Sequence, residues 1–226
     1  MISIYPKLLV ANLSVTTLFL GSAGAAQAAN IIVNGDFETG NIGFSSDYQY
    51  LSPSLGEGVY TIGTNPNSVH SPFASFGDHT TGTGNMMIVN GSESPNQTVW
   101  QQTIDVTPNT EYNFAAWIAS AISREPAKLQ FSINATSIGD IFTAPTTPGD
   151  WQEFNATWIS GSNTQATVSI VDLNLAFGGN DFTLDDISME VASTPVPEPL
   201  TILGSATALG FGVLLKRESS KKQNKS

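Results

Sequence analysis

The chain of 226 residues contains no cysteine and few cations. Without thiols, disulfide bonds and thiol redox chemistry are excluded. Between Asn30 and Pro195 there are 17 acidic residues against two basic ones, Arg124 and Lys128, which gives a net charge of −15. Such a region offers phosphate groups almost no cationic partner, so nucleic acid is excluded as a partner. The charge instead favours neutral ligands or cations.

Motifs for catalysis are also missing. Only His70 and His79 could act as bases near neutral pH, and the chain has neither Gly-x-Ser-x-Gly nor His-Glu-x-x-His. The segment "GTGN" at residues 82–85 precedes an expected strand rather than a helix, so no helix dipole supports a phosphate site there. Seventeen acids form many pairs, but no spacing singles out a pair for glycoside hydrolysis. The sequence therefore predicts a protein that is not an enzyme.

Long apolar runs are missing as well. Lys7 precedes the thirteen residues from Leu8 to Leu20, and the small-x-small sequence Ala26-Gln27-Ala28 follows. This order predicts a signal peptide over residues 1–28, with cleavage before Ala29, and hence an exported protein. A short membrane anchor is the alternative, although thirteen residues are fewer than the roughly 20 that span a bilayer as a helix.

A second apolar run, Leu200 to Leu215, has sixteen residues without a charge. As a helix it would reach roughly 24 Å, against a hydrocarbon core of about 30 Å. Lys216 and Arg217 follow directly, and by the positive-inside rule they would stay in the cytoplasm. The sequence predicts a marginal transmembrane helix over residues 200–215 and a basic cytoplasmic tail over 216–226. A buried core helix is the alternative.

A Pro-rich linker over residues 193–199 precedes this helix and contains Val196-Pro197-Glu198-Pro199. The motif, the short apolar helix and the basic tail together resemble the PEP-CTERM sorting signal of bacterial exopolysaccharide-associated surface proteins. In that family, a membrane transpeptidase called exosortase reads the Pro-Glu-Pro, and the helix and tail are removed. The resemblance implies an exosortase-type processing enzyme as partner and a transient anchor in the inner membrane. It implies a final location at the cell surface or in the extracellular matrix.

The region between these signals, residues 29–192, has the period-two alternation of an all-β domain. Apolar residues alternate in "EYNFAAWIAS" at 111–120, "KLQFSINA" at 128–135 and "WQEFNATW" at 151–158. Turn clusters such as "TPNT", "TTPGD" and "SGSNTQ" separate these segments. The pattern predicts a β-sandwich or jelly roll, with long loops between 47 and 84 around strands near Tyr60 and Phe73.

The two ends of this region carry a second resemblance. "NIIVNGDFETG" at 30–40 and "GNDFTLDDISMEV" at 179–191 resemble the first and last strands of galactose-binding-type jelly rolls, the fold of many carbohydrate-binding modules. In those modules a structural calcium is often bound between the first and last strands, with a Glu and an Asp among its ligands. By position the resemblance assigns these roles to Glu38 and Asp185.

The last segment gives an independent reason to expect a cation. Phe182 and Leu184 share one parity and Ile187 the other, so the buried face switches at Asp185-Asp186, which predicts a β-bulge. Two carboxylates at a bulge are costly without a cation, and calcium takes six to eight oxygen ligands. Further carboxylates that could supply such ligands are Asp36, Asp181 and Asp186. Alternatively, Asp36 and Asp181 only cap turns.

Binding of a sugar would need an exposed aromatic ring, because sugars stack their C–H faces on flat rings. Trp117 and Trp151 have the parity opposite to the apolar faces of their segments, whereas Trp100 and Trp158 share the apolar parity. The candidate ligand-binding residues are therefore Trp117 and Trp151, together with Asp78 and His79 of a polar loop. The alternative is that these tryptophans are structural and the histidines lie in ordinary loops.

Three functions are compatible with these observations. The first is a non-catalytic, carbohydrate-binding jelly roll that is exported to the cell surface and binds polysaccharide. The second is a structural or adhesion protein of the matrix without a discrete sugar site. The third is a glycan hydrolase on a jelly-roll scaffold, which would need two carboxylates facing each other in a cleft.

Overall fold

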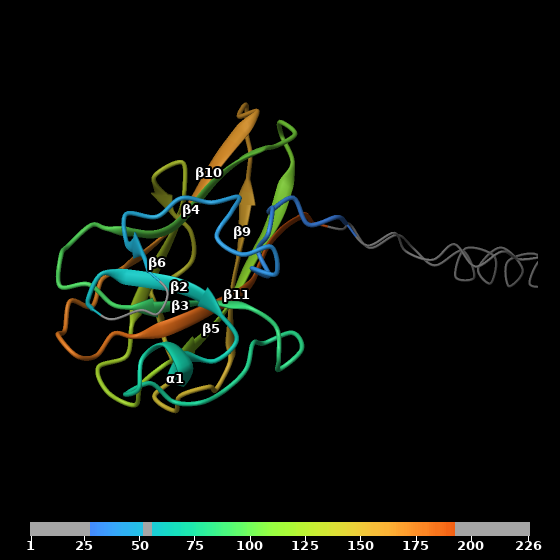
Figure 1. The fold of residues 1–226 in the computed structure, drawn as a ribbon. Coiled ribbons are helices and arrows are strands. Elements are labelled where there is room, and N and C mark those ends of the chain that lie inside the picture. Colours follow the sequence, from blue (N-terminus) through green and yellow to red (C-terminus); the bar gives the residue numbers. More distant parts are fainter. Residues whose placement is uncertain (1–27, 52–55, 193–226) are drawn as a thin grey trace, which may run out of the picture. The chain divides into compact units, whose positions relative to one another are not determined.

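A computed structural model describes residues 28–51 and 56–192, within one compact unit of residues 27–193. Two β-sheets pack face to face as a jelly-roll sandwich, which confirms the predicted all-β class (Figure 1). The signal-peptide run with Ala26 lies outside the described residues, as do the Pro-Glu-Pro motif, the predicted membrane helix and the basic tail. In the part of the chain that the structure describes, no helix is long and apolar enough to cross a membrane.

The first sheet has six strands in the order β1-β2-β3-β11-β5-β9, with β1 parallel to β2 and the other pairs antiparallel. Its strands are β1 (Gln49–Tyr50), β2 (Val59–Gly63), β3 (Met86–Asn90), β11 (Phe182–Val191), β5 (Glu111–Ser120) and β9 (Gln152–Ile159). The second sheet has the order β4-β10-β6-β7, and β8 pairs with β6. Its strands are β4 (Thr98–Asp105), β10 (Gln165–Asp172), β6 (Lys128–Ile133), β7 (Thr136–Ser137) and β8 (Phe142–Thr143).

The main core lies between the two sheets and is built from the alternating apolar residues. The inward faces of β5 and β6 are fully or almost fully buried, as their parity predicts. Phe131 of β6 stacks on Phe154 of β9 with ring centroids 3.8 Å apart. Trp100 is fully buried, and Trp158 is partly buried against the core, which confirms the assignment of both tryptophans.

The predicted bulge is present in β11. Its pairing with β5 shifts register between Asp185 and Ser188, and Asp186 has φ = 45°, in the left-handed region. The extra residue lets Leu184 and Ile187 both point into the core although their parity differs. The side chain of Asp186 is therefore directed to the outer face of the sheet, where the site described below lies.

The predicted first strand over residues 30–40 is wrong. This segment is a loop that crosses β11, and single hydrogen bonds join Ile31 to Met189 and Ile187 to Gly35. Asn34 and Phe37 have φ values of 56° and 57°, in the left-handed region, so the backbone turns at both residues instead of continuing as an extended strand. The Asn34 side chain caps the resulting turn, because it bonds the amide of Thr39 and two nearby carbonyl groups.

The predicted strand near Phe73 is also wrong. Residues 64–85 contain the single turn of helix α1 (Pro66–Val69), which Asn65 caps, and otherwise form loops. These loops lie over the outer face of the six-stranded sheet. They enclose a second, small core with the buried residues Phe73, Met86, Ile88 and Ala121. Residues 64–85 cover only part of the outer face. The rest of that face, over β5 and β9, contains an open groove, which is described below.

Candidate functional site

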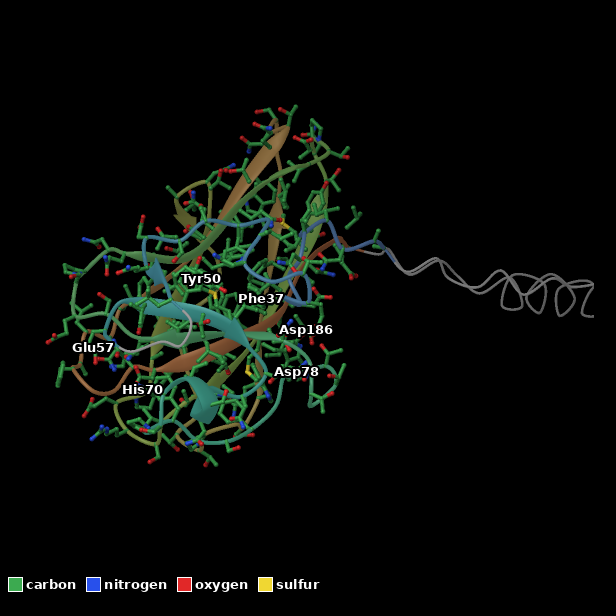
Figure 2. The ribbon with its side chains drawn as sticks, in the orientation of Figure 1. Phe37, Tyr50, Glu57, His70, Asp78 and Asp186 are labelled. Atoms are coloured by element: carbon green, nitrogen blue, oxygen red, sulfur yellow. The ribbon has the colours of Figure 1, made fainter. Side chains whose placement is uncertain are left out.

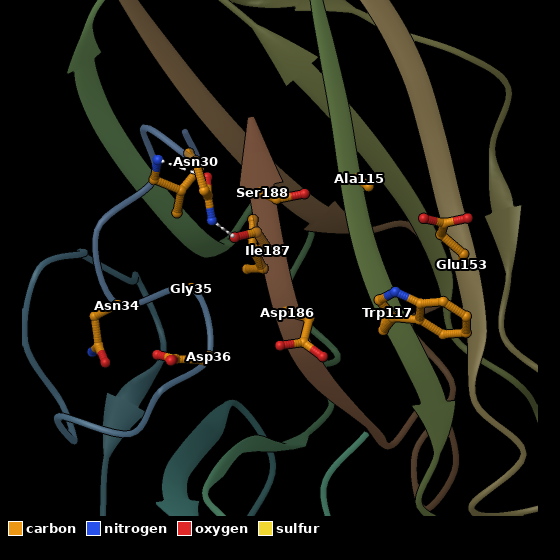
Figure 3. Close-up of a pocket in the computed structure, with 11 residues that line it drawn as sticks. Asn30, Asn34, Gly35, Asp36, Ala115, Trp117, Glu153, Asp186, Ile187 and Ser188 are labelled. Atoms are coloured by element: carbon orange, nitrogen blue, oxygen red, sulfur yellow. Dashed lines mark hydrogen bonds between the residues drawn. The ribbon is translucent and has the colours of Figure 1, made fainter. Parts of the chain in front are cut away.

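An open groove crosses the outer face of the six-stranded sheet. Its first part has a volume of about 330 Å³ and lies between the loop of residues 30–36 and strand β5 (Figure 3). Its second part, of about 530 Å³, continues along β5 and β9, and both parts share Ala115 and Glu153. We call this the β5–β9 groove. Its polar lining comprises Asn30, Asn34, Asp36, Asn113, Glu153, Asn155, Thr157, Asp186 and Ser188.

Trp117 lies in the floor of the groove, as Figure 3 shows. It faces outward because its neighbours on either side, Ala116 and Ile118, face the core and successive side chains of a strand point to opposite faces. In the ladder it is paired with Asp185 on one side and Glu153 on the other. The indole is partly exposed, and the imidazole of His79 stacks on it with a centroid distance of 3.7 Å and a tilt of 14°.

His79 is held in place from two sides. Its Nδ1 lies 2.7 Å from Oδ2 of Asp186, and its backbone N–H donates to Oδ2 of Asp185 at 2.9 Å. The hydroxyl of Thr80 also donates to the carboxylate of Asp186. Asp186 thereby joins the loop to the bulge of β11 and fixes the stacked pair at one end of the groove.

Asp78 stabilises the same loop through hydrogen bonds to its backbone and to one of its side chains. Its carboxylate accepts hydrogen bonds from the amides of Thr81 and Gly84 at 2.8 and 2.6 Å, and one from the Thr81 hydroxyl. Burial acts to raise the pKa of Asp78, but these hydrogen bonds outweigh it and the net pKa is lowered. Asp78 does not line the groove, so the structure gives this predicted ligand residue a supporting position.

Trp151 also lies outside the groove. It packs against the small core beneath residues 64–85, and its Nε1 donates to the carbonyl oxygen of Gly77 at 3.2 Å. Its ring contacts that of His79 edge-on, with centroids 5.9 Å apart. The structure therefore brings all four predicted ligand residues into one cluster, but places only Trp117 in the lining of the groove.

Sequence reasoning missed the polar wall on β9. Glu153, Asn155 and Thr157 are exposed and alternate with the inward Phe154 and Ala156. The alternation that predicted this strand also indicated that these three residues face outward. It was not decisive, because polar residues on the outer face of an antiparallel strand are the rule.

The predicted calcium ligands do not form one set. Glu38 and Asp78 meet at Gly84, where a Cβ would lie 2.2 Å from Oε1 of Glu38 and 3.1 Å from Oδ2 of Asp78. Asp185 is buried beside them, and burial followed by the charge of Asp186 raises its pKa to about 7. Asp36 is exposed and lines the groove instead.

Asp181 belongs to a different part of the molecule. Its Oδ1 accepts from the amide of Gly91, which follows β3, whereas the loop of Asp78 precedes β3. Asp181 and Asp185 are four positions apart along an extended chain, which corresponds to roughly 13 Å. The structure therefore places Asp181 away from the loop of Asp78 and from Asp185. Across the residues described, no three His, Asp or Glu side chains already stand at metal-ligand spacing.

The buried carboxyl groups predict an unusual pH dependence of stability. Burial raises the pKa of Asp172 to about 6 and that of Asp181 to about 7, from an ordinary value of 3.8. The folded state then binds more protons than the unfolded state between about pH 4 and 7, so stability falls as pH rises through this window. We expect the melting temperature in chelator to be several degrees lower at pH 7.5 than at pH 5.

Asp172→Asn should flatten this slope, because the amide cannot ionise. The matched control is Asp140→Asn, because the side chain of Asp140 is exposed to solvent. Thermal melts monitored by circular dichroism between pH 4.5 and 8 measure the effect. A melting temperature that rises steadily over this range would contradict the assignment.

Comparisons with protein-family models and with curated proteins found no match. Among solved structures, similar folds include the CBM22-1 xylan-binding domain of Paenibacillus barcinonensis Xyn10C, with 11% identity and a TM-score of 0.49 over 75% of this chain and 99% of that one. TmCBM61 in complex with β-1,4-galactotriose has 13% identity and a TM-score of 0.48 over 73% and 100%. A family 16 carbohydrate-binding module has 20% identity and a TM-score of 0.40 over 71% and 99%.

The chain also spans 66% of the C-terminal domain of EclA, described as a sugar-binding protein, with 20% identity and a TM-score of 0.39 over 41% of this chain. These structural neighbours are carbohydrate-binding modules and a domain of a sugar-binding protein. The likeness concerns the fold.

Proposed function

We propose that this protein is exported, processed at its C-terminus by an exosortase-type enzyme, and binds a neutral polysaccharide in the β5–β9 groove without cleaving it. The groove would hold the protein on exopolysaccharide at the cell surface or in the extracellular matrix. The observation that carries the proposal is the partly exposed indole of Trp117 in the floor of a groove lined by amide and carboxylate side chains.

The aromatic surface suits the apolar faces of a sugar ring. His79 occupies one face of the indole and stiffens it, so the ring is held in one orientation before a ligand arrives. Prior fixing of a side chain reduces the entropy lost on binding. Ala115, which has almost no side chain, leaves space beside the indole for a ring to lie on the sheet.

The polar lining suits hydroxyl groups and disfavours anions. Asn113, Asn155 and Glu153 present oxygen and nitrogen atoms along the groove, and such groups bond sugar hydroxyls. Lys and Arg do not occur among the residues that line it, while three carboxylates do. A polysaccharide rich in uronic acid or sulfate would meet like charge without a compensating cation.

A glycan array probed with the full chain in calcium-containing buffer tests the proposal. We expect retention on at least one neutral polysaccharide and none on polygalacturonate. Absence of retention on every glycan favours the structural or adhesion role. Release of reducing ends from the retained polysaccharide would favour the hydrolase, since Asp36, Glu153 and Asp186 share the groove.

The structural calcium is likewise a proposal. Glu38, Asp78 and Asp185 fit it in donor chemistry, since all three offer hard oxygen atoms around one loop, and a bound cation would balance their charge. Calcium there would fix the loop that carries His79. We expect calcium to raise the melting temperature of the full chain at pH 7.5 by several degrees, and Glu38→Gln to reduce this rise.

Glu93→Gln serves as a control, because Glu93 is exposed and lies after β3, away from the loop of residues 78–84. Melts with calcium and with chelator, recorded for both variants, measure the effect. A Glu38→Gln protein that responds to calcium as the parent does would remove Glu38 from the site.

A further inference from the structure

A second set of buried oxygen atoms lies at the opposite end of strand β3 from the loop of Asp78. It comprises Tyr48, Glu57, Asp172, Asn180 and Asp181, and we call it the oxygen cluster. Asp172 ends β10, while Asn180 and Asp181 immediately precede β11. Four of these side chains are almost fully buried and Glu57 is partly buried, which is unusual for so many acidic and polar groups. Figure 2 labels Glu57, which marks this end of the molecule, and Asp78 and Asp186, which mark the other.

Hydrogen bonds to nearby backbone groups connect three members of the cluster, Asp172, Asn180 and Asp181. Oδ1 of Asp172 accepts from the amide of Asn174 at 2.9 Å, and the side-chain amide of Asn180 donates to the carbonyl of the same residue at 2.5 Å. Asn180 also packs on Gly91, where a Cβ would lie 2.0 Å from its Oδ1. The amide of Gly91 in turn donates to Asp181 at 3.0 Å. Asn180 therefore lies between Asp172, which it reaches through Asn174, and Asp181, which it reaches through Gly91.

Three acceptor atoms of the cluster remain without a donor. They are Oδ2 of Asp172, Oδ1 of Asn180 and Oε2 of Glu57, each buried from solvent and unpaired. A buried acceptor that is not satisfied costs about 1–3 kcal/mol, so three in one place call for a ligand. Asp172 is 4% exposed and Asn180 0% exposed, and the unpaired oxygen atom of each is itself buried.

Arg124, a basic residue near the cluster, does not pair with its carboxylates. The Arg124 guanidinium lies close enough to Gly178 that a Cβ there would be 3.6 Å from it, and its charge acts on Asp181. Yet among the described residues it makes no ion pair with Glu57, Asp172 or Asp181. Three carboxylates against one guanidinium leave a local charge of about −2 when all are ionised.

We propose that the oxygen cluster is a cation site, separate from the one at Glu38, and that it takes a divalent ion of the calcium type. Asp172, Glu57 and the amide oxygen of Asn180 would supply ligands, and Asp181 would add negative charge. The donors are all oxygen atoms, which favours calcium over zinc. The proposed ligands are two carboxylates and one amide oxygen. Such a set does not count as three His, Asp or Glu side chains, and no group of three such side chains is found among the described residues.

Binding of terbium to the full chain tests the site, because Tyr48 lies in the cluster and can transfer excitation to a bound lanthanide. After treatment with chelator at pH 7.5, we expect terbium emission that calcium displaces. Asp172→Asn should weaken the terbium binding that calcium displaces at least tenfold. Glu57→Gln should have the same effect, and because Glu57 is only partly buried, this substitution is less disruptive to folding. Glu38→Gln should leave terbium binding to the oxygen cluster unchanged.

A second measurement separates a cation from a merely structural carboxylate. In chelator at pH 7.5, Asp172→Asn should melt at a higher temperature than the parent, because it removes a buried charge. In calcium the order should reverse, because only the parent gains from the ion. Equal responses of Asp172→Asn, Glu57→Gln and the parent to calcium would overturn the proposal, as would the absence of any calcium-competed emission that survives Glu38→Gln.

Discussion

Replacing Trp117 by alanine is expected to weaken binding to the retained polysaccharide by roughly thirtyfold, equivalent to about 2 kcal/mol, the size of an interface hot spot. The indole is the aromatic surface of the β5–β9 groove, and its loss also frees His79 from the stacked pair. Trp117→Phe keeps a flat ring and should recover part of the affinity. Isothermal titration with the glycan identified on the array measures both values.

The control for this experiment is Ile159→Ala. Ile159 lies on the same outer face of β9, is 67% exposed and does not line the groove, so its loss should leave the affinity unchanged. Melting curves of all variants exclude general unfolding, since Trp117 is only partly buried and packs outside the main core. Unchanged affinity in Trp117→Ala would place the sugar site elsewhere on the molecule.

The change Gly35→Ala should destabilise the domain by about 3 kcal/mol, which lowers the melting temperature by roughly 6–12 °C for a protein of this size. A Cβ at residue 35 would lie 2.0 Å from the main-chain carbonyl oxygen of Ile187 and 3.1 Å from the side chain of Ile32. Neither neighbour is the free end of a flexible side chain. The loop of residues 30–36 would have to lift off β11 and lose the hydrogen bond from Ile187 to Gly35, which is 3.0 Å long.

This loop is also one wall of the groove, so the variant should lose glycan affinity at temperatures where it is still folded. Gly56→Ala is the matched control, because among the described residues no atom lies within 4 Å of a Cβ there and its φ is ordinary. Calorimetry and glycan titration of the two variants measure the difference. Equal melting temperatures for Gly35→Ala and the parent would mean that the loop does not rest on β11 in solution.

Most strands could be predicted because their signal is local. Alternation of apolar and polar residues in β5, β6 and β9 follows from the two-residue period of an extended chain with one buried face. The bulge at Asp185-Asp186 could be predicted for the same reason, since a change of parity within one strand leaves no other way to keep both halves in the core. Segments without such alternation gave wrong predictions, at residues 30–40 and near Phe73.

The candidate site was only partly predictable. Trp117 and His79 were both named from the sequence, one by its parity and the other as a polar loop residue, yet nothing in the sequence placed one ring on the other. Glu153 and Asn155 were missed, because their alternation marks any solvated strand. Asp181 was misplaced, because proximity along the chain was taken for proximity in space.

The sequence by itself determined which residues face the core, where β11 changes face, and the large negative charge of the domain. These properties depend on neighbours along the chain and on composition. Only the tertiary structure decided that residues 30–36, His79, β5, β9 and Asp186 meet around one groove, and that Asp172 and Asn180 meet at the other end of the sandwich. Such meetings depend on strand order and loop path, which in the groove bring His79 to Asp186, 107 positions away along the chain.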